Sequence, residues 1–176
     1  MKSIKPLGKP SYGSIGHLPT SRMGLGDHHI TEGEARIATV KTRDKHDVVI
    51  VQEKLDGSNV GVAKINGEIV PLMRAGYRAI ESHYEQHHHF HNWVMQHLDR
   101  FDELLEDGER ACGEWLMQAH GTRYDLQPHG MEPFVLFDLM RGTERAVWED
   151  VFLRGMTLDF ATPHVVHQGG ALSIDE

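Results

Sequence analysis

The chain has 176 residues, 39% of them hydrophobic and 25% charged, a composition typical of one soluble globular domain with its own core. It contains no apolar run long enough to span a bilayer and no signal-peptide pattern, and its formal net charge of −8 argues against general electrostatic binding of nucleic acid. The only cysteine, Cys112, has no partner for an internal disulfide, which fits a reducing cytoplasm. We therefore expect a cytoplasmic protein, and the lack of a long apolar run predicts no membrane partner.

The first part of the chain differs from the rest in charge. Residues 1–50 carry eight Lys or Arg against five Asp or Glu, whereas residues 51–176 carry ten against twenty-one. Residues 1–30 are rich in Gly, Ser and Pro and show little periodicity, which predicts loop. We therefore expect a basic N-terminal arm over residues 1–46 that guides a polyanion. The alternative is a solvated, partly ordered arm without such a role.

Four strands are expected in the first half of the chain. Two of them are indicated by β-branched and apolar runs. The Asn66–Gly67 pair predicts a tight turn that joins the other two into a hairpin. Pro71 has no N–H for a ladder bond, so the return strand should lie at a sheet edge or carry a bulge. The predicted strands cover residues 35–40, 47–54, 59–65 and 68–74.

From Glu81 onward the hydrophobic period becomes helical. The pattern predicts one long amphipathic helix over residues 82–105. Two further strands are expected over residues 110–117 and 132–140, with a loop between them, and a short strand over 163–168. Residues 144–154 fit either a helix or a strand. The helical pattern rests on Phe90, Trp93, Val94, His97, Leu98, Phe101, Leu104 and Leu105.

A tight polar corner follows the second predicted strand. Lys54 ends that strand, and Asp56, Gly57, Ser58 and Asn59 follow within five residues. A lysine amine is protonated at neutral pH, but burial and nearby cations lower its pKa and free its lone pair for nucleophilic attack. The glycine lets the backbone turn sharply and lets a ligand approach the main chain, and the Ser and Asn side chains can donate to phosphate oxygens. Taken alone, the corner fits a hairpin with a surface lysine better than a nucleophile.

Further segments give this corner a context. The segment "KLDGSN" (54–59) resembles the K-x-D-G motif of covalent nucleotidyltransferases, the superfamily of ATP-dependent ligases and mRNA capping enzymes. Segments that resemble the family's arginine-bearing, glutamate-bearing and aromatic–acidic motifs follow in the same order: "LMRAGY" (72–77), "CGEWL" (112–116) and "FVLFDLM" (134–140). The sequences of these motifs are most similar to those of RNA ligases of the second phage-type family. The resemblance implies an α+β fold with an antiparallel-sheet nucleotidyltransferase core, of the ATP-grasp-like ligase adenylation type.

The resemblance implies a reaction and its main residues. Lys54 would attack the α-phosphorus of ATP and form a lysyl–AMP phosphoramidate, while Mg²⁺ offsets the charge of the leaving pyrophosphate. Arg74 would contact a phosphate or a nucleic-acid end through its fork of donors. Glu114 would accept hydrogen bonds from the ribose hydroxyls. Outside this family, Arg74 would be a surface arginine and Glu114 the partner in a strand-end ion pair.

Other positions would complete the nucleotide pocket. Phe137 would stack on adenine, although core packing is the simpler role of a lone Phe. Asp138 would order the site or the water shell of the metal, and Asn59 would touch the phosphates. Glu53 would read the adenine amino group, although strand alternation points it away from the lysine. The nucleotide-binding set that we expect is Glu53, Asp56, Gly57, Asn59, Arg74, Glu114, Phe137 and Asp138.

Two later family elements are not found in this sequence. They are an E-G-x-V-type strand and a K-x-K pair, and no lysine follows Lys64. The final "SIDE" forms a capping box of Ser173 and Glu176 with no helix after it. We therefore expect residues 47–176 to be the N-terminal part of an RNA ligase adenylation domain, incomplete at the C-terminus, with weak or absent adenylyl transfer on its own.

Fourteen histidines are many for this length. His83, His87 and His91 are spaced by four residues on the predicted helix, a row that can bind zinc or nickel, although a polar helix face is the simpler interpretation. His120, six residues after Glu114, is a candidate to approach the ligand. The sequence contains no H-E-x-x-H, C-x-x-C or P-loop pattern.

The sequence thus predicts a polynucleotide ligase of the kind used in RNA repair. It would use ATP and Mg²⁺ to join RNA, or DNA, ends that carry a 5′-phosphate and a 3′-hydroxyl. The alternatives are a DNA ligase or capping-like transferase, a non-catalytic fragment that binds nucleotides or RNA ends, and a histidine-rich metal-binding protein.

Overall fold

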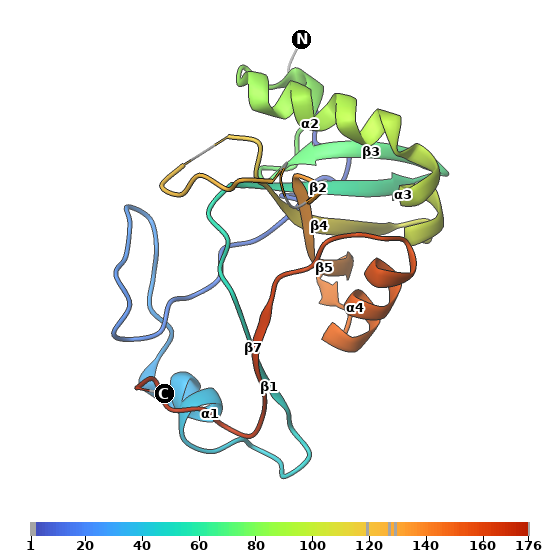
Figure 1. Cartoon of the computed structure of the whole chain (residues 1–176). Helices are drawn as coiled ribbons and strands as arrows, with labels where there is room; N and C mark the ends of the chain where they lie inside the picture. The colour runs from blue at the N-terminus through green and yellow to red at the C-terminus, as the bar shows by residue number, and fades with distance from the viewer. Residues whose placement is uncertain (1–2, 119, 127, 129, 176) are drawn as a thin grey trace. The chain divides into compact units, whose positions relative to one another are not determined.

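The computed structural model describes residues 3–118, 120–126, 128 and 130–175, which fall into two compact units (Figure 1). Unit 1 comprises Met1–Gly13 and Leu55–Pro163, and unit 2 comprises Ser14–Lys54 and His164–Glu176. The arm expected over residues 1–46 is therefore shared between the two units. The predicted boundary between an arm and a ligase domain after residue 46 stays a prediction.

Unit 1 is built on an antiparallel sheet. Its strands lie in the order β3-β2-β4-β5-β6. The turn between β2 and β3 has positive φ at Asn66 (51°) and Gly67 (78°), which confirms the predicted hairpin. Pro71 lies in β3 at the sheet edge, where a missing N–H costs no ladder bond. The strands are β2 Ser58–Ile65, β3 Glu68–Met73, β4 Glu109–Trp115, β5 Phe134–Arg141 and β6 Glu144–Arg145.

The single helix predicted over residues 82–105 is wrong, because the structure has two helices. His97 separates them with φ −122° and ψ 26°. Its imidazole Nδ1 lies 2.7 Å from the Trp93 carbonyl, so the side chain occupies the acceptor that its own backbone N–H would use in a continuous helix. Residues 144–154 form β6 and the start of a further helix. The helical elements of unit 1 are η1 Ala79–Glu81, α2 Glu85–Gln96, α3 Leu98–Leu104 and α4 Trp148–Thr157.

The main core lies between one face of the sheet and the helices (Figure 1). Phe90 and Val94 of α2 and Phe101 of α3 are fully buried there, so the periodic positions of the sequence do form one apolar face across the break. Phe134 of β5 contacts several of the surrounding aromatic rings at centroid distances of 5.6–6.1 Å.

The N-terminal segment 3–13 covers the opposite face of the sheet. Leu7 packs against the small cluster of Ala63, Val70 and Leu72. Ser11 is buried, and its hydroxyl donates to the Met73 carbonyl over 2.8 Å. Residues predicted to be loop thus belong to unit 1, held by contacts that have no local sequence signal.

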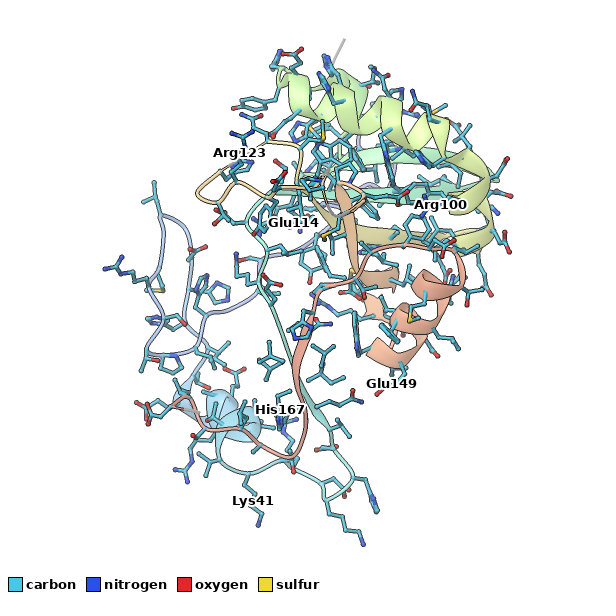
Figure 2. All side chains as sticks on the ribbon, viewed as in Figure 1. Lys41, Arg100, Glu114, Arg123, Glu149 and His167 are labelled. Carbon is cyan, nitrogen blue, oxygen red and sulfur yellow. The ribbon has the colours of Figure 1, made fainter. Side chains whose placement is uncertain are left out.

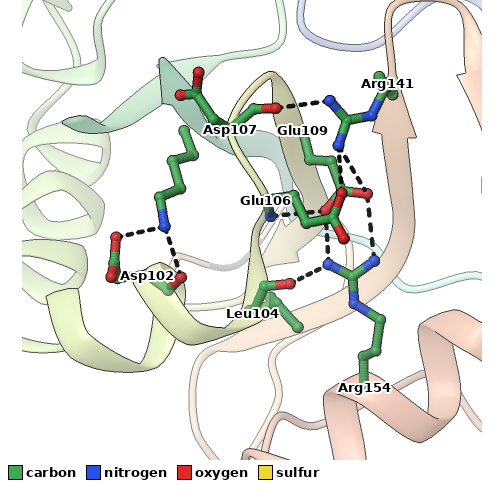
Figure 3. Close-up of polar contacts among 8 residues, drawn as sticks. Asp102, Leu104, Glu106, Asp107, Glu109, Arg141 and Arg154 are labelled. Atoms are coloured by element: carbon green, nitrogen blue, oxygen red, sulfur yellow. Dashed lines mark hydrogen bonds and ion pairs between the residues drawn. The ribbon is translucent and has the colours of Figure 1, made fainter. Parts of the chain in front are cut away.

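A cluster of charged residues connects α4 to the start of β4 and the end of β5 (Figure 3). Arg154 of α4 donates to Glu109 Oε2 at the start of β4 over 2.6 Å and to the Leu104 carbonyl at the end of α3. Arg141 at the end of β5 donates to Glu106 Oε2 over 2.7 Å. Burial raises the pKa of Glu109, but the hydrogen bonds from Arg154 and from the Glu106 backbone outweigh it, so the pKa lies below its usual value.

Unit 2 contains α1 Glu32–Thr39 and an antiparallel pair of strands, β1 Val49–Gln52 and β7 Val165–Gly169. The strand predicted over residues 35–40 is wrong, because these residues lie in or at the end of α1. Thr31 and Glu34 form a capping box, with the Thr31 hydroxyl 3.2 Å from the Glu34 N–H and the Glu34 carboxylate 2.8 Å from the Thr31 N–H.

The capping box predicted at Ser173 and Glu176 involves Glu176, which lies outside the described residues. Among the described residues, no helix is both long and apolar enough to cross a membrane.

Candidate functional site

The polar corner is held to β4 by strand pairing and by a hydrogen bond to a side chain of β4. The Gly57 N–H donates to Glu114 Oε1 over 2.9 Å, where β2 and β4 pair Asn59 with Glu114. Glu114 is labelled in Figure 2. A Cβ at Gly57 would lie 2.5 Å from the Trp115 carbonyl oxygen, so this approach of the corner to β4 requires glycine. The structure therefore brings together the lysine-motif corner and the glutamate predicted to bind the ribose.

Asp56 holds the loop that follows β4. Its Oδ2 accepts from the Gly121 N–H over 2.6 Å and the Thr122 N–H over 3.1 Å, while its own N–H donates to the Tyr124 hydroxyl over 2.8 Å. The Asp56 carboxylate, which was predicted to bind a nucleotide, thus holds this loop against the corner. Tyr124 was not among the predicted site residues, because a tyrosine in a polar loop carries no signal of its own.

Two further residues of the corner lie beside Glu114. Ser58 Oγ is 3.0 Å from His120 Nε2, so the loop histidine considered from the sequence does reach the corner. Asn59 Oδ1 is buried and accepts no hydrogen bond from the described residues. Leaving such an acceptor unpaired costs about 1–3 kcal/mol, which a donor on a ligand would recover. The phosphate contact expected of Asn59 stays a prediction, which would use the amide nitrogen of the same side chain.

A β-bulge sets the direction of the aromatic–acidic motif. Cys112 pairs with Asp138 but Gly113 pairs with Leu136, so Phe137 is the extra residue on β5. Leu136 lies in the main core, whereas Phe137 packs against the second cluster, that of Tyr12, on the opposite face of the sheet. In a regular strand, Phe137 and Asp138 would lie on opposite faces of the sheet. Because of the bulge, both side chains lie on the face that carries Tyr12.

Phe137 and Asp138 share Tyr12 as a neighbour. The rings of Tyr12 and Phe137 meet edge-on, with centroids 5.2 Å apart. Arg145 of β6 lies 4.8 Å above the Tyr12 ring, donates to its hydroxyl over 2.7 Å and pairs with Asp138 Oδ2 over 2.9 Å. Burial raises the pKa of Asp138, with Arg145 opposing it, and burial is also the largest cause of the raised pKa of Tyr12. Neither Tyr12 nor Arg145 was predicted.

Arg74 lies in the exposed loop after β3. Its backbone carbonyl accepts from the N–H groups of Ser11 and Tyr12, and its guanidinium donates to the Gly13 carbonyl over 3.4 Å. This weak contact leaves the guanidinium exposed. Its role toward phosphate stays a prediction.

Glu53 and Lys54 belong to unit 2, and Leu55 begins the second segment of unit 1. Both side chains are exposed, and the Glu53 N–H donates to the His164 carbonyl over 2.9 Å. The nucleophile predicted at Lys54 and the adenine contact predicted at Glu53 therefore stay predictions that rest on the sequence motif.

The predicted histidine row does not form a regular helical series. His83 precedes α2, and only His87 and His91 of the three lie on it. His87 Nδ1 is 2.6 Å from the Ser82 hydroxyl. Among the described residues, no group of three or more His, Cys, Asp or Glu side chains is placed to hold a metal ion.

The antiparallel sheet, with helices on one face and the lysine-motif corner joined to a strand-borne glutamate, has the nucleotidyltransferase fold of RNA ligases. The chain belongs to the RNA ligase family, whose model matches residues 47–175. No curated protein matches the chain.

Solved structures of RNA ligases share this fold. The Naegleria gruberi RNA ligase with PPi matches 93% of this chain and 48% of its own, with a TM-score of 0.55 and 14% identity. An archaeal ATP-dependent RNA ligase in form 2 matches 80% of this chain and 35% of its own, with a TM-score of 0.52 and 16% identity. The chain thus spans between about a third and a half of these proteins, and at such identities the likeness is one of fold.

Proposed function

We propose that this chain is a ligase-type adenylyltransferase that carries AMP on Lys54 for the joining of RNA ends. The observation that carries the proposal is the 2.9 Å bond between the Gly57 N–H and Glu114 Oε1, which unites two of the family's motifs. The names of the neighbours support ATP as the nucleotide, since one is an ATP-dependent RNA ligase and another is described with PPi.

The proposed step forms one bond and breaks one. The lone pair of Lys54 Nζ attacks the α-phosphorus of ATP, a P–N bond forms, and the bond from that phosphorus to the bridging oxygen breaks. Pyrophosphate leaves with the electron pair, and the amine proton passes to solvent. The attack requires the amine in its neutral form.

Unit 1 would hold the adenosine. Glu114 and the unpaired Asn59 acceptor lie side by side and suit the two ribose hydroxyls, and Phe137 offers an apolar ring for adenine. Mg²⁺ commonly binds through substrate phosphates and water with only one or two carboxylates. We therefore propose that it arrives with ATP.

The test is intact mass after incubation with ATP and Mg²⁺. The parent should gain the mass of one AMP, Lys54→Ala should gain none, and Lys41→Ala, which removes another exposed lysine of unit 2, should behave as the parent. An adduct that survives in Lys54→Ala would refute the assignment of the nucleophile.

A parent protein that is folded but gains no AMP would refute transfer by this chain. ATP binding that Glu114→Ala weakens would in that case favour the second candidate, a nucleotide-binding chain without transfer. Joining of RNA that carries a 5′-phosphate and a 3′-hydroxyl is the further activity to assay, with DNA of the same sequence as the comparison.

A further inference from the structure

Four histidines with no role in the proposed transfer gather beside the corner of unit 1. We call this set the histidine edge: His87, His88 and His91 on α2, and His120 on the loop after β4. His120 joins it to the corner through its 3.0 Å contact with Ser58 Oγ. His120 and His88 are both close enough to His87 to lower its pKa.

Basic side chains are the groups that act on the titration of the histidine edge. Burial is the largest cause of the lowered pKa of His87 and of His91; the charged groups that add to it are His88 and His120 for the first, and His88 and Arg78 for the second. Among the described residues, no carboxylate is among the groups that shift either pKa.

Three carboxylates, Glu68, Asp99 and Asp102, line one pocket with His91. Glu68 pairs with Arg78 over 3.2 Å and Asp102 with Lys64 over 2.7 Å, and the exposed Asp99 is not among the groups that shift the pKa of His91. Glu85 on α2 pairs with His89 over 3.3 Å. On the loop side, Asp56 accepts the two amides of Gly121 and Thr122. Protonated imidazoles on this edge would therefore gain most from an anion supplied by a ligand.

Hydrogen bonds hold the imidazoles in place. Ser82 contacts His87 Nδ1 through its hydroxyl over 2.6 Å and His88 Nε2 through its carbonyl over 2.7 Å. The rings are thus held by one nitrogen each, and a protonated ring has a second N–H to donate. Arg123, exposed on the same loop as His120, adds a permanent positive charge (Figure 2).

We infer that the histidine edge binds backbone phosphates of the RNA strand whose end is joined, and that it does so with protonated histidines. The inference rests on the proposed function, since it adds a surface for the polynucleotide to the nucleotide site. A phosphate raises the pKa of an imidazole that it contacts, so RNA binding takes up protons and tightens as the pH falls. This gives a protein of net charge −8 a local surface for a polyanion.

The test is fluorescence anisotropy with a labelled single-stranded RNA that carries a 5′-phosphate. Binding is measured at pH 8 and pH 6, at one ionic strength, with EDTA and without ATP, so that neither metal nor transfer contributes. The parent should bind roughly fivefold more tightly at pH 6, the scale expected when a histidine takes up a proton on binding. The double variant His87→Gln/His120→Gln should lose most of this difference.

His89→Gln is the matched control, because His89 lies on the same helix but is exposed and paired with Glu85. It should keep the pH dependence of the parent. Circular dichroism of each variant establishes that it is folded. An equal pH dependence in parent and double variant, or no RNA binding by the parent, would overturn the inference.

The two proposals fail separately. An AMP adduct on Lys54 together with RNA binding that does not depend on His87 and His120 would overturn the inference alone. RNA binding that depends on these histidines in a protein without the adduct would support the histidine edge and overturn only the proposed transfer.

Discussion

At the scale of single residues, the corner depends on a close backbone approach. Glu114 accepts from the Gly57 N–H, which orients the carboxylate, and an ionised carboxylate has lone pairs for several donors. Such an arrangement needs the main chain of the corner to lie against β4, and a side chain at position 57 would stand in the way.

Gly57→Ala should therefore destabilise unit 1. The new Cβ would lie 2.5 Å from the Trp115 carbonyl oxygen, so the strand or the corner must move, at a cost of about 1–3 kcal/mol. Urea unfolding followed by tryptophan fluorescence measures this, because Trp93, Trp115 and Trp148 all lie in unit 1.

Gly13→Ala is the control, since a Cβ at Gly13 meets nothing within 4 Å among the described residues and the backbone there has no positive φ. It should unfold as the parent does. Equal stability of both variants would show that the corner is not as tightly packed against β4 as the structure indicates.

The residues that the sequence could identify at this scale are those with a motif. Asp56, Gly57 and Glu114 lie at the corner because the K-x-D-G and glutamate segments pair on adjacent strands. Tyr12 and Arg145 could not be identified, because their contact joins positions 133 residues apart and neither residue type is distinctive in its segment.

At the scale of elements, alternation and turn signals predicted the hairpin and the central strands well. The errors came where side chains compete for backbone groups. The Thr31–Glu34 capping box starts a helix where apolar residues suggested a strand, and His97 interrupts a helix whose hydrophobic period continues. The bulge in β5 was also invisible, since one added residue leaves the composition of a strand unchanged.

The attachment of α4 gives a prediction at this scale. Arg154→Gln should lower the free energy of unfolding by about 2 kcal/mol, because a half-buried, charge-assisted pair with Glu109 and a bond to the Leu104 carbonyl are lost. Arg141→Gln removes a pair with the exposed Glu106, a longer 3.8 Å contact with Glu109 and a bond to the Asp107 carbonyl. These contacts are more exposed to solvent, so the substitution should cost less, about 1 kcal/mol.

The difference between these two variants should shrink in acid. The pKa of Glu109 is lowered in the folded state, so the stabilising pair is present above the usual carboxylate range and is lost as the pH falls through the folded-state pKa. Urea unfolding at pH 7 and pH 3 checks both points. Equal effects of the two substitutions at pH 7 would mean that burial does not strengthen the Arg154 pair.

At the scale of the whole molecule, charge is governed by histidine. The net charge is −8 with all fourteen histidines neutral, and the calculated isoelectric point is about 5.9, so mild acidification removes most of the negative charge. This change is favourable for binding a polyanion but unfavourable for the fold wherever a histidine is buried among cations. At the histidine edge, protonation would favour the binding of phosphates and would also lower the stability of the fold.

The stability of unit 1 should therefore fall as the pH drops below about 6.5, the ordinary histidine pKa. The pKa values of His87 and His91 are lowered in the folded state, chiefly by burial, so the unfolded chain takes up protons first and the free energy of unfolding declines until the folded-state pKa values are passed. His87→Gln/His91→Gln should show a smaller decline between pH 7.5 and 5 in urea unfolding followed by tryptophan fluorescence, whereas His29→Gln, in unit 2, should match the parent. Parallel curves for parent and double variant would contradict the lowered pKa values.

The histidine edge gives a further prediction about RNA. Added RNA should restore part of the stability that the parent loses in acid, because its phosphates would interact favourably with the protonated histidines of the folded state.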